Sequence, residues 1–269
     1  MRFSPAALLA VALLLAPTAL AAKDLAPSDG IALDLEKVLP CPPQSNVAAG
    51  AGFTCAQAPA LEKRDYQAVL DAQKNATPEE KTLAIADAAR PSVAQFGRPL
   101  WQQIAGPACK IAPDIAAAKD DKELADKLPA TVAVFKAMTK ESIRTSGGAK
   151  KVYNRLRPFD TVIEGMPRIV PLLPVDNLKD SPSYPSGHTA FAYEAALILS
   201  NLVPEEQDLI YARAAQYGHN RLVVGVHYPS DVEQGRVSGE LIAGAFLQKD
   251  DFRALLEKAR PEIRKTLCR

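Results

Sequence analysis

Apolar residues recur at helical spacing through most of the chain beyond residue 60. The stretches with this spacing are 59–73, 77–89, 121–146, 186–203, 204–226, 229–248 and 250–265. The alternation that is typical of β-strands is scarce, and we find no internal repeat. The pattern predicts an all-α fold, a helical bundle in a single domain over residues 61–269.

Local signals mark several ends of these helices. Thr77 has the residue type of an N-cap and is followed by Pro78 and two acids, as is common in a first helical turn. Pro129 is expected to divide the stretch 121–146 into two helices. The segment 159–184 is rich in proline, and we expect it to be a loop.

The first 60 residues differ from the rest of the chain. Arg2, an apolar run over 6–16 and the small residues at 19–21 are typical of a signal peptide that is cleaved near Ala21. The run is too short for a membrane anchor, so the sequence predicts a periplasmic or secreted protein without stable membrane insertion. Residues 22–60 are rich in proline and alanine and are expected to be an irregular N-terminal segment.

Charge and cysteine content indicate which partners and which disulfides to expect. The 32 basic and 31 acidic residues nearly balance, which gives no reason to expect nucleic acid or an anionic membrane as a partner. The four cysteines are an even number in an exported chain and indicate two disulfides, with three pairings open: Cys41, Cys55, Cys109 and Cys268.

Candidate chemistry begins with the stretch KKVYNRLRP. Lys150 and Arg157 are seven residues apart, close to two helical turns, so both are expected to project from one face. Pro158 then favours an extended Arg157 and the end of the helix. Taken alone, two such bases are more often a solvated surface pair.

A second stretch, YPSGHTAF, places a turn before a predicted helix. Ser186 can cap that helix, and Gly187 lets its backbone approach a ligand closely. N–H groups at a helix start bind anions, and His188 follows directly. Taken alone, a histidine that merely packs at a helix start is an equal alternative.

The third stretch, YGHNRLVVGVHYPSDVEQGR, supplies a second histidine. His227 and Asp231 are about one turn apart, so the carboxylate can fix one imidazole nitrogen and leave the other free. Arg221 adds a third cation to Lys150 and Arg157. Cations and N–H donors around one oxyanion indicate phosphate, and two histidines indicate a nucleophile and a general acid.

Together the three stretches resemble the motifs K-x6-RP, PSGH and SR-x5-H-x3-D of the type-2 phosphatidic acid phosphatase and vanadium haloperoxidase superfamily. Within this superfamily, the stretches SYPSGHT and HYPSDVEQGR are similar to the corresponding motifs of the class A bacterial non-specific acid phosphatases. The motifs span residues 150–236, about a third of the chain. One position departs from the pattern, since Asn220 stands where the superfamily has serine before the arginine.

The resemblance implies an all-α fold of this kind and an exported acid phosphatase that hydrolyses small-molecule phosphate monoesters without a metal or other cofactor. It implies that His227 attacks phosphorus to form a phosphohistidine, that Asp231 orients His227, and that His188 protonates the leaving group. It assigns phosphate binding to six residues: Lys150, Arg157, Ser186, Gly187, Asn220 and Arg221. It also implies a homo-oligomer and a phosphotransferase side activity.

Three other functions are alternatives for a chain that carries these three motifs. A lipid-phosphate or pyrophosphate phosphatase of this superfamily usually spans the membrane, and no later apolar stretch here is long enough. A vanadate-dependent haloperoxidase, with His227 as the vanadate ligand, is usually a much longer chain. A phosphate-binding module needs the cations and the helix start, but neither the pair His227 and Asp231 nor a second histidine.

Overall fold

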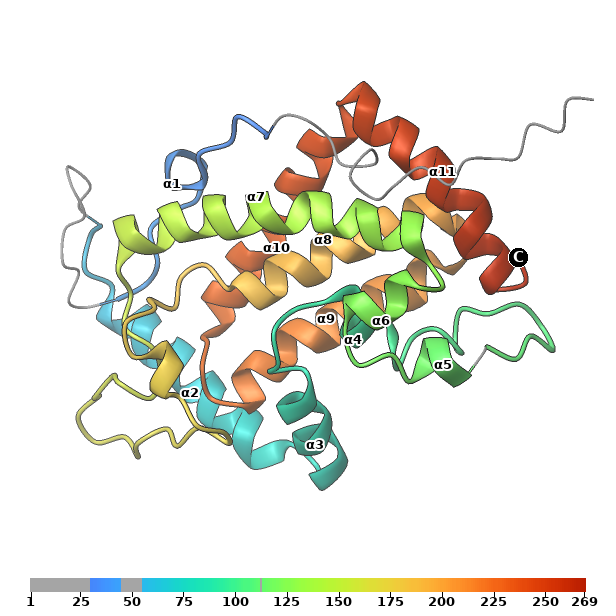
Figure 1. The fold of residues 1–269 in the computed structure, drawn as a ribbon. Coiled ribbons are helices and arrows are strands. Elements are labelled where there is room, and N and C mark those ends of the chain that lie inside the picture. Colours follow the sequence, from blue (N-terminus) through green and yellow to red (C-terminus); the bar gives the residue numbers. More distant parts are fainter. Residues whose placement is uncertain (1–29, 45–54, 112) are drawn as a thin grey trace, which may run out of the picture.

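The structure is a computed structural model that describes residues 30–44, 55–111 and 113–269 (Figure 1). Within these ranges it contains helices and no strand, which confirms the all-α prediction. The long helices are α2 (Pro59–Asn75), α3 (Pro78–Ala86), α7 (Pro129–Tyr153), α8 (Gly187–Leu202), α9 (Gln207–Val223), α10 (Pro229–Leu247) and α11 (Asp250–Thr266). The short ones are α1 (Leu35–Val38), α4 (Val93–Gly97), α5 (Pro113–Ala116) and α6 (Asp121–Ala125), with 3-10 turns at Asp176–Leu178 and Pro204–Glu206.

The locally signalled helix starts form as expected. Thr77 and Glu80 form a reciprocal capping box at the start of α3, with Pro78 in the first turn. α6 ends before Pro129, which opens α7. The end of α7 was not anticipated: the helix stops at Tyr153, and Asn154 takes a left-handed conformation with φ of 43°. Arg157 therefore lies beyond the helix, and the expectation that it shares a helical face with Lys150 is wrong.

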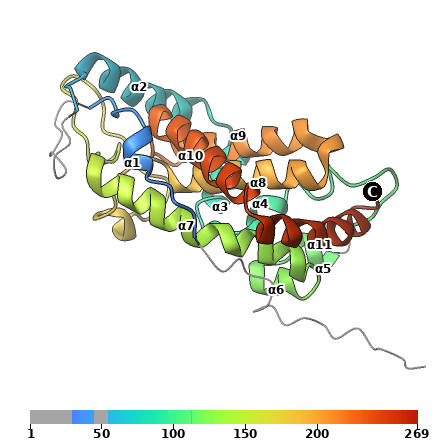
Figure 2. The ribbon, with the colours of Figure 1, turned by 90° about the horizontal axis from the view of Figure 1, so that it is seen from above.

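Helix α8 lies in the middle of the bundle. Figures 1 and 2 both show α7 on one side of it and α9 on the other, and α10 packs closely along it. Most of its side chains are buried, including Phe191, Ile198 and Leu199. A helix that is apolar nearly all round is expected at the centre of a helical core.

Two glycines on α10 set the close approach of α10 to the start of α8. A Cβ on Gly239 would lie 2.2 Å from the Ala190 carbonyl oxygen, and one on Gly235 would lie 2.6 Å from the Ser186 carbonyl oxygen. The Ser186 amide also donates to the Asp231 carbonyl oxygen at 3.0 Å. The first turns of α8 and α10 are thereby held side by side, and these turns carry the second and third sequence motifs.

The cysteine pairing left open by the sequence is resolved as Cys41 with Cys55 and Cys109 with Cys268. The second disulfide ties the C-terminus to the segment after α4, where Trp101 is part of the buried core. Among the described residues, no helix is both long and apolar enough to cross a membrane. The predicted signal peptide, 1–21, lies outside the described residues, as does much of the segment 22–60.

Candidate active site

His227 and Asp231 form a buried pair at the start of α10. The His227 Nδ1 lies 3.3 Å from Asp231 Oδ2, which also accepts from the Tyr228 amide and so caps the helix. A carboxylate can only accept, so Nδ1 carries the proton and Nε2 presents a lone pair. That lone pair faces the Arg157 guanidinium, whose NH1 lies 3.3 Å from Nε2.

Arg155, which the sequence analysis did not single out, contacts Asp231 on the side opposite His227. Its NH1 donates to Asp231 Oδ1 at 2.6 Å and its NH2 to Asp65 Oδ2 at 3.0 Å, and its guanidinium lies 4.0 Å from the centre of the Tyr228 ring. Burial by itself would raise the pKa of Asp231, but the Arg155 charge and the His227 hydrogen bond lower it well below the usual range. Asp231 is therefore a carboxylate that keeps the His227 ring in one orientation.

Three cations converge near His227. Arg157 donates to the carbonyl oxygens of Ser181 and Val226, and the Lys150 ammonium donates to those of Pro182 and Ser183. The third cation is Arg221.

Arg221 is 3% exposed, and its Nε and NH1 have no hydrogen-bond partner among the described residues. An orphaned buried guanidinium is costly unless a ligand satisfies it.

The pKa values of these three groups are all lowered. Burial, followed by the neighbouring Arg157 charge, lowers the pKa of Lys150 to about 7. Burial likewise lowers the pKa of both Arg157 and Arg221 to about 10. Cations that destabilise one another in a buried cluster are stabilised together by an anion between them.

His188 lies in the first turn of α8, beside this cluster. Its Nε2 donates to the Ala89 carbonyl oxygen at 2.9 Å, which leaves Nδ1 as the nitrogen that can exchange a proton. Burial, then the Arg221 charge, lowers the pKa of His188 well below its usual value. The pKa of His227 is also well below its usual value, mainly through burial.

The start of α8 has the form of an anion site. The Ser186 side chain caps the helix by accepting from the Thr189 amide, and it also accepts from the Thr189 hydroxyl. The first-turn amides have no intrahelical acceptor, and a Cβ on Gly187 would meet no heavy atom within 4 Å. Space above Gly187 is thus open to a ligand.

Asn220 is buried, and its amide donates to Asp87 Oδ2 at 2.7 Å. Arg213 holds both oxygens of the same carboxylate, at 2.8 and 2.7 Å. Asp87 and Arg213 were also missed by the sequence reading. They fix the segment after α3, which carries Ala89, against α9.

The structure thus brings the predicted residues together from four helix ends and two loops. Among the described residues, no group of three His, Cys, Asp or Glu side chains is placed to hold a metal ion. The supporting residues that sequence reasoning missed are Asp65, Asp87, Ala89, Arg155 and Arg213. The one local signal for any of them was a second arginine two residues before Arg157.

Part of the chain is similar to known proteins. Residues 130–253 match the PAP2 superfamily. The chain is 36% identical over 117 residues to a non-specific acid phosphatase of Providencia stuartii, covering 44% of this chain and 46% of that protein. It is 38% identical over 135 residues to an acid phosphatase of Zymomonas mobilis, covering 48% and 49%. The chain therefore spans about half the length of the curated relatives it matches.

A solved structure, of the first transmembrane PAP2 type phosphatidylglycerolphosphate phosphatase from Bacillus subtilis, is 21% identical with a TM-score of 0.42, over 74% of this chain and 87% of that one. The resemblance inferred from the three motifs is confirmed by the match over residues 130–253 and by the acid phosphatases among the relatives. Residues 130–253, a little under half of the chain, are thus similar to the PAP2 superfamily.

Proposed function

We propose that this chain is an acid phosphatase that hydrolyses phosphate monoesters through a phosphohistidine at His227, without a metal ion. One observation carries the proposal: the unprotonated Nε2 of His227 faces Arg157, in a cluster of three cations. Two of them, Arg157 and Arg221, are buried, and Arg221 Nε and NH1 have no hydrogen-bond partner among the described residues. A phosphoryl group bound there would meet the nucleophile and its charge stabilisers together.

The first half-reaction transfers the phosphoryl group. The lone pair of His227 Nε2 forms a bond to phosphorus while the bond from phosphorus to the ester oxygen breaks. The negative charge of the bound ester favours protonation of His188, whose pKa is otherwise lowered by burial and by the Arg221 charge. The imidazolium gives the proton on Nδ1 to the ester oxygen, so the leaving group departs as an alcohol. Asp231 stabilises the positive charge that develops on the His227 ring.

The second half-reaction releases phosphate. Neutral His188 takes a proton from water, whose oxygen attacks phosphorus as the bond to His227 Nε2 breaks. His188 is then protonated again and His227 has its lone pair back. An alcohol in place of water would give phosphotransfer, which we propose as a side activity.

Six residues hold the phosphoryl oxygens in this mechanism: Lys150, Arg157, Ser186, Gly187, Asn220 and Arg221. The Asn220 amide has two N–H donors, and Asp87 occupies one of them. Asn220 is thus able to donate the other to an oxygen, in the place where the superfamily has a serine hydroxyl. We further propose an exported location, supported by the two disulfides, which persist in oxidising compartments.

The test is hydrolysis of p-nitrophenyl phosphate by the oxidised protein at about pH 5.5 with excess EDTA. We expect activity in the wild type and its loss in His227→Ala, because His227 supplies the nucleophile in the proposed mechanism. His219→Ala is the matched control, since His219 is exposed on α9 and outside the cluster, and it should keep full activity. Wild-type activity that EDTA abolishes, or that survives in His227→Ala, would contradict the proposal.

A further inference from the structure

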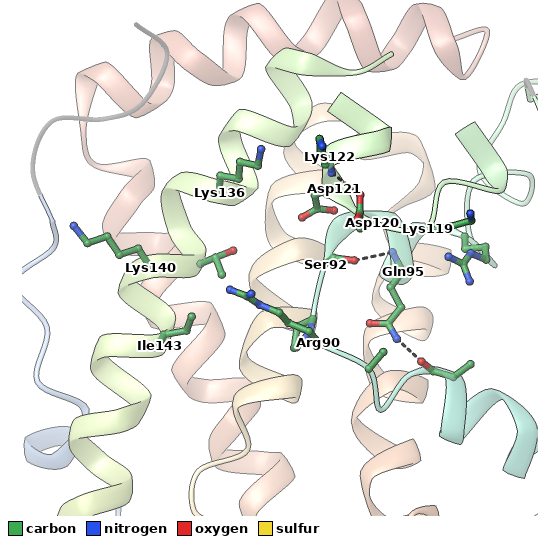
Figure 3. A pocket seen from close by; sticks show the side chains of 15 residues that line it. Arg90, Ser92, Gln95, Lys119, Asp120, Asp121, Lys122, Lys136, Lys140 and Ile143 are labelled. Carbon is green, nitrogen blue, oxygen red and sulfur yellow. Dashed lines mark hydrogen bonds between the residues drawn. The ribbon is translucent and has the colours of Figure 1, made fainter. Parts of the chain in front are cut away.

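A cavity of about 830 Å³ lies beside the catalytic cluster, between α7 and the segment that runs from the end of α3 through α4 (Figure 3). Its lining carries six basic and two acidic side chains. We call it the leaving-group pocket, and define it by Arg90, Pro91, Asp120, Asp121, Lys136, Lys140 and Ile143.

The two acids of this pocket offset only part of its positive charge, and the basic group that interacts with one of them, Asp121, is Lys136. Asp120 accepts from the amides of Lys122 and Glu123 and caps α6, and Asp121 accepts from the Ala94 amide. Within the described ranges, the side chains of Arg90, Lys136 and Lys140 form no hydrogen bond or ion pair. Figure 3 shows Arg90 extending from its segment toward Lys140 and Ile143 on α7.

The pocket shares a wall with the catalytic cluster. Ala89 lines the pocket, and its carbonyl oxygen accepts the hydrogen bond from His188 Nε2. His188 is the group that protonates the leaving oxygen in the proposed mechanism. His188 therefore lies between the pocket wall and the phosphoryl site, with Nε2 toward the wall and Nδ1 toward the leaving oxygen.

Helix α7 also connects the two places. Residues 136, 140, 143, 147 and 150 are separated by four and three residues in turn, so they lie on one face. A Cβ on Gly147 would meet no heavy atom within 4 Å, so this face is open between Ile143 and Lys150. Ten residues separate Lys140 from Lys150, a rise of ~15 Å.

We propose that this pocket binds the leaving group, and that the preferred substrates are phosphate monoesters whose leaving group has an apolar body ending in a second anionic group. The inference rests on the proposed function. Ile143, 62% exposed, and Pro91 would contact the apolar body. Arg90 and Lys140 would pair with the second anion.

The test compares alkyl monophosphates with alkanediol bisphosphates of the same chain length, from butyl to dodecyl. After correction for the two equivalent phosphates, we expect kcat/KM to favour the longer bisphosphates by about tenfold, the size of one charge-assisted contact. The shortest pair should show no preference, because its second phosphate cannot reach Lys140.

Substitutions assign the preference to the pocket. Lys140→Gln together with Arg90→Gln should abolish it while leaving p-nitrophenyl phosphate hydrolysis unchanged, since both side chains are exposed and outside the catalytic cluster. Lys258→Gln, exposed on α11, removes one charge elsewhere and should preserve it. Equal rates for both series in the wild type, or a preference that survives the double substitution, would overturn the inference.

Failure of the proposed function would give a different result. It would appear as no hydrolysis of p-nitrophenyl phosphate by the wild type. The calorimetric Kd of the two ester series then tests the pocket by the same criterion: about tenfold tighter bisphosphate binding that requires Arg90 and Lys140 supports it, and equal Kd values overturn it.

Discussion

Arg155→Met should destabilise the protein by about 3–5 kcal/mol and lower phosphatase activity about 100-fold or more. Arg155 is 1% exposed and pairs with two buried carboxylates, Asp65 and Asp231. Its removal would leave both carboxylates buried without their cation. The pKa of Asp231 would then rise, because burial would no longer be opposed by the Arg155 charge.

Urea unfolding at neutral pH measures the first effect. Arg264→Met is the matched control, because Arg264 pairs with Glu205 at the surface, where both side chains are about one-third exposed. We expect that control to cost less than about 1 kcal/mol. Equal losses of unfolding free energy in the two variants would contradict the structural role given to Arg155.

Arg155→Lys separates positioning from folding if Arg155→Met does not fold. Lysine keeps the charge but cannot reproduce the planar fork that spans both carboxylates and stacks on Tyr228. We expect a folded protein with reduced kcat, and an acidic limb of its rate profile displaced to higher pH as the depression of the Asp231 pKa weakens. An unchanged pH profile would show that Arg155 does not act through Asp231.

Glu194→Gln should make the protein more stable at pH 8 by several kcal/mol and leave its stability near pH 4.5 almost unchanged. Glu194 is 1% exposed in the central helix α8, and neither carboxyl oxygen has a hydrogen-bond partner among the described residues. Burial raises its pKa to about 8.

The sign follows from proton binding. Between its ordinary pKa of 4.5 and about 8, Glu194 is protonated in the folded chain and ionised in the unfolded chain. Its contribution to the unfolding free energy therefore falls by about 1.4 kcal/mol for each pH unit over that window. Glutamine has no proton to lose, so the difference between variant and wild type should grow with pH.

Urea unfolding across this pH range measures the difference. Glu164→Gln is the matched control, since Glu164 is exposed in the segment 159–184, and its difference from wild type should stay near zero. A Glu194→Gln difference that does not change with pH would mean that the carboxyl group is solvated in the native protein.

The sequence predicted what depends on local pattern. The apolar spacing and the capping residues Thr77, Pro78 and Ser186 act within a few residues, so helix positions follow from them. The end of α7 did not follow, because the seven-residue spacing of Lys150 and Arg157 matches two helical turns although the helix stops at Asn154. A left-handed asparagine has only a weak sequence signal.

The residues that hold the site residues in place were the hardest part of the site to predict from the sequence. Arg155 meets Asp65 and Asp231 across 90 and 76 residues, and Arg213 meets Asp87 across 126. Pairs of this kind depend on tertiary packing, which no local spacing encodes. The N-terminal half, in which only helical texture could be recognised, supplies Asp65, Asp87 and the Ala89 carbonyl.

Trapping the covalent intermediate tests the central claim most directly. p-Nitrophenolate leaves without needing a proton, whereas release of phosphate needs His188 to activate water, so His188→Ala should accumulate phosphoenzyme. The variant is mixed with p-nitrophenyl phosphate and quenched in alkali, and its peptides are examined by mass spectrometry. We expect one phosphoryl group on the peptide that carries His227. A phosphoryl group on another residue, or p-nitrophenolate release by His188→Ala with no phosphoenzyme at any time, would contradict the mechanism.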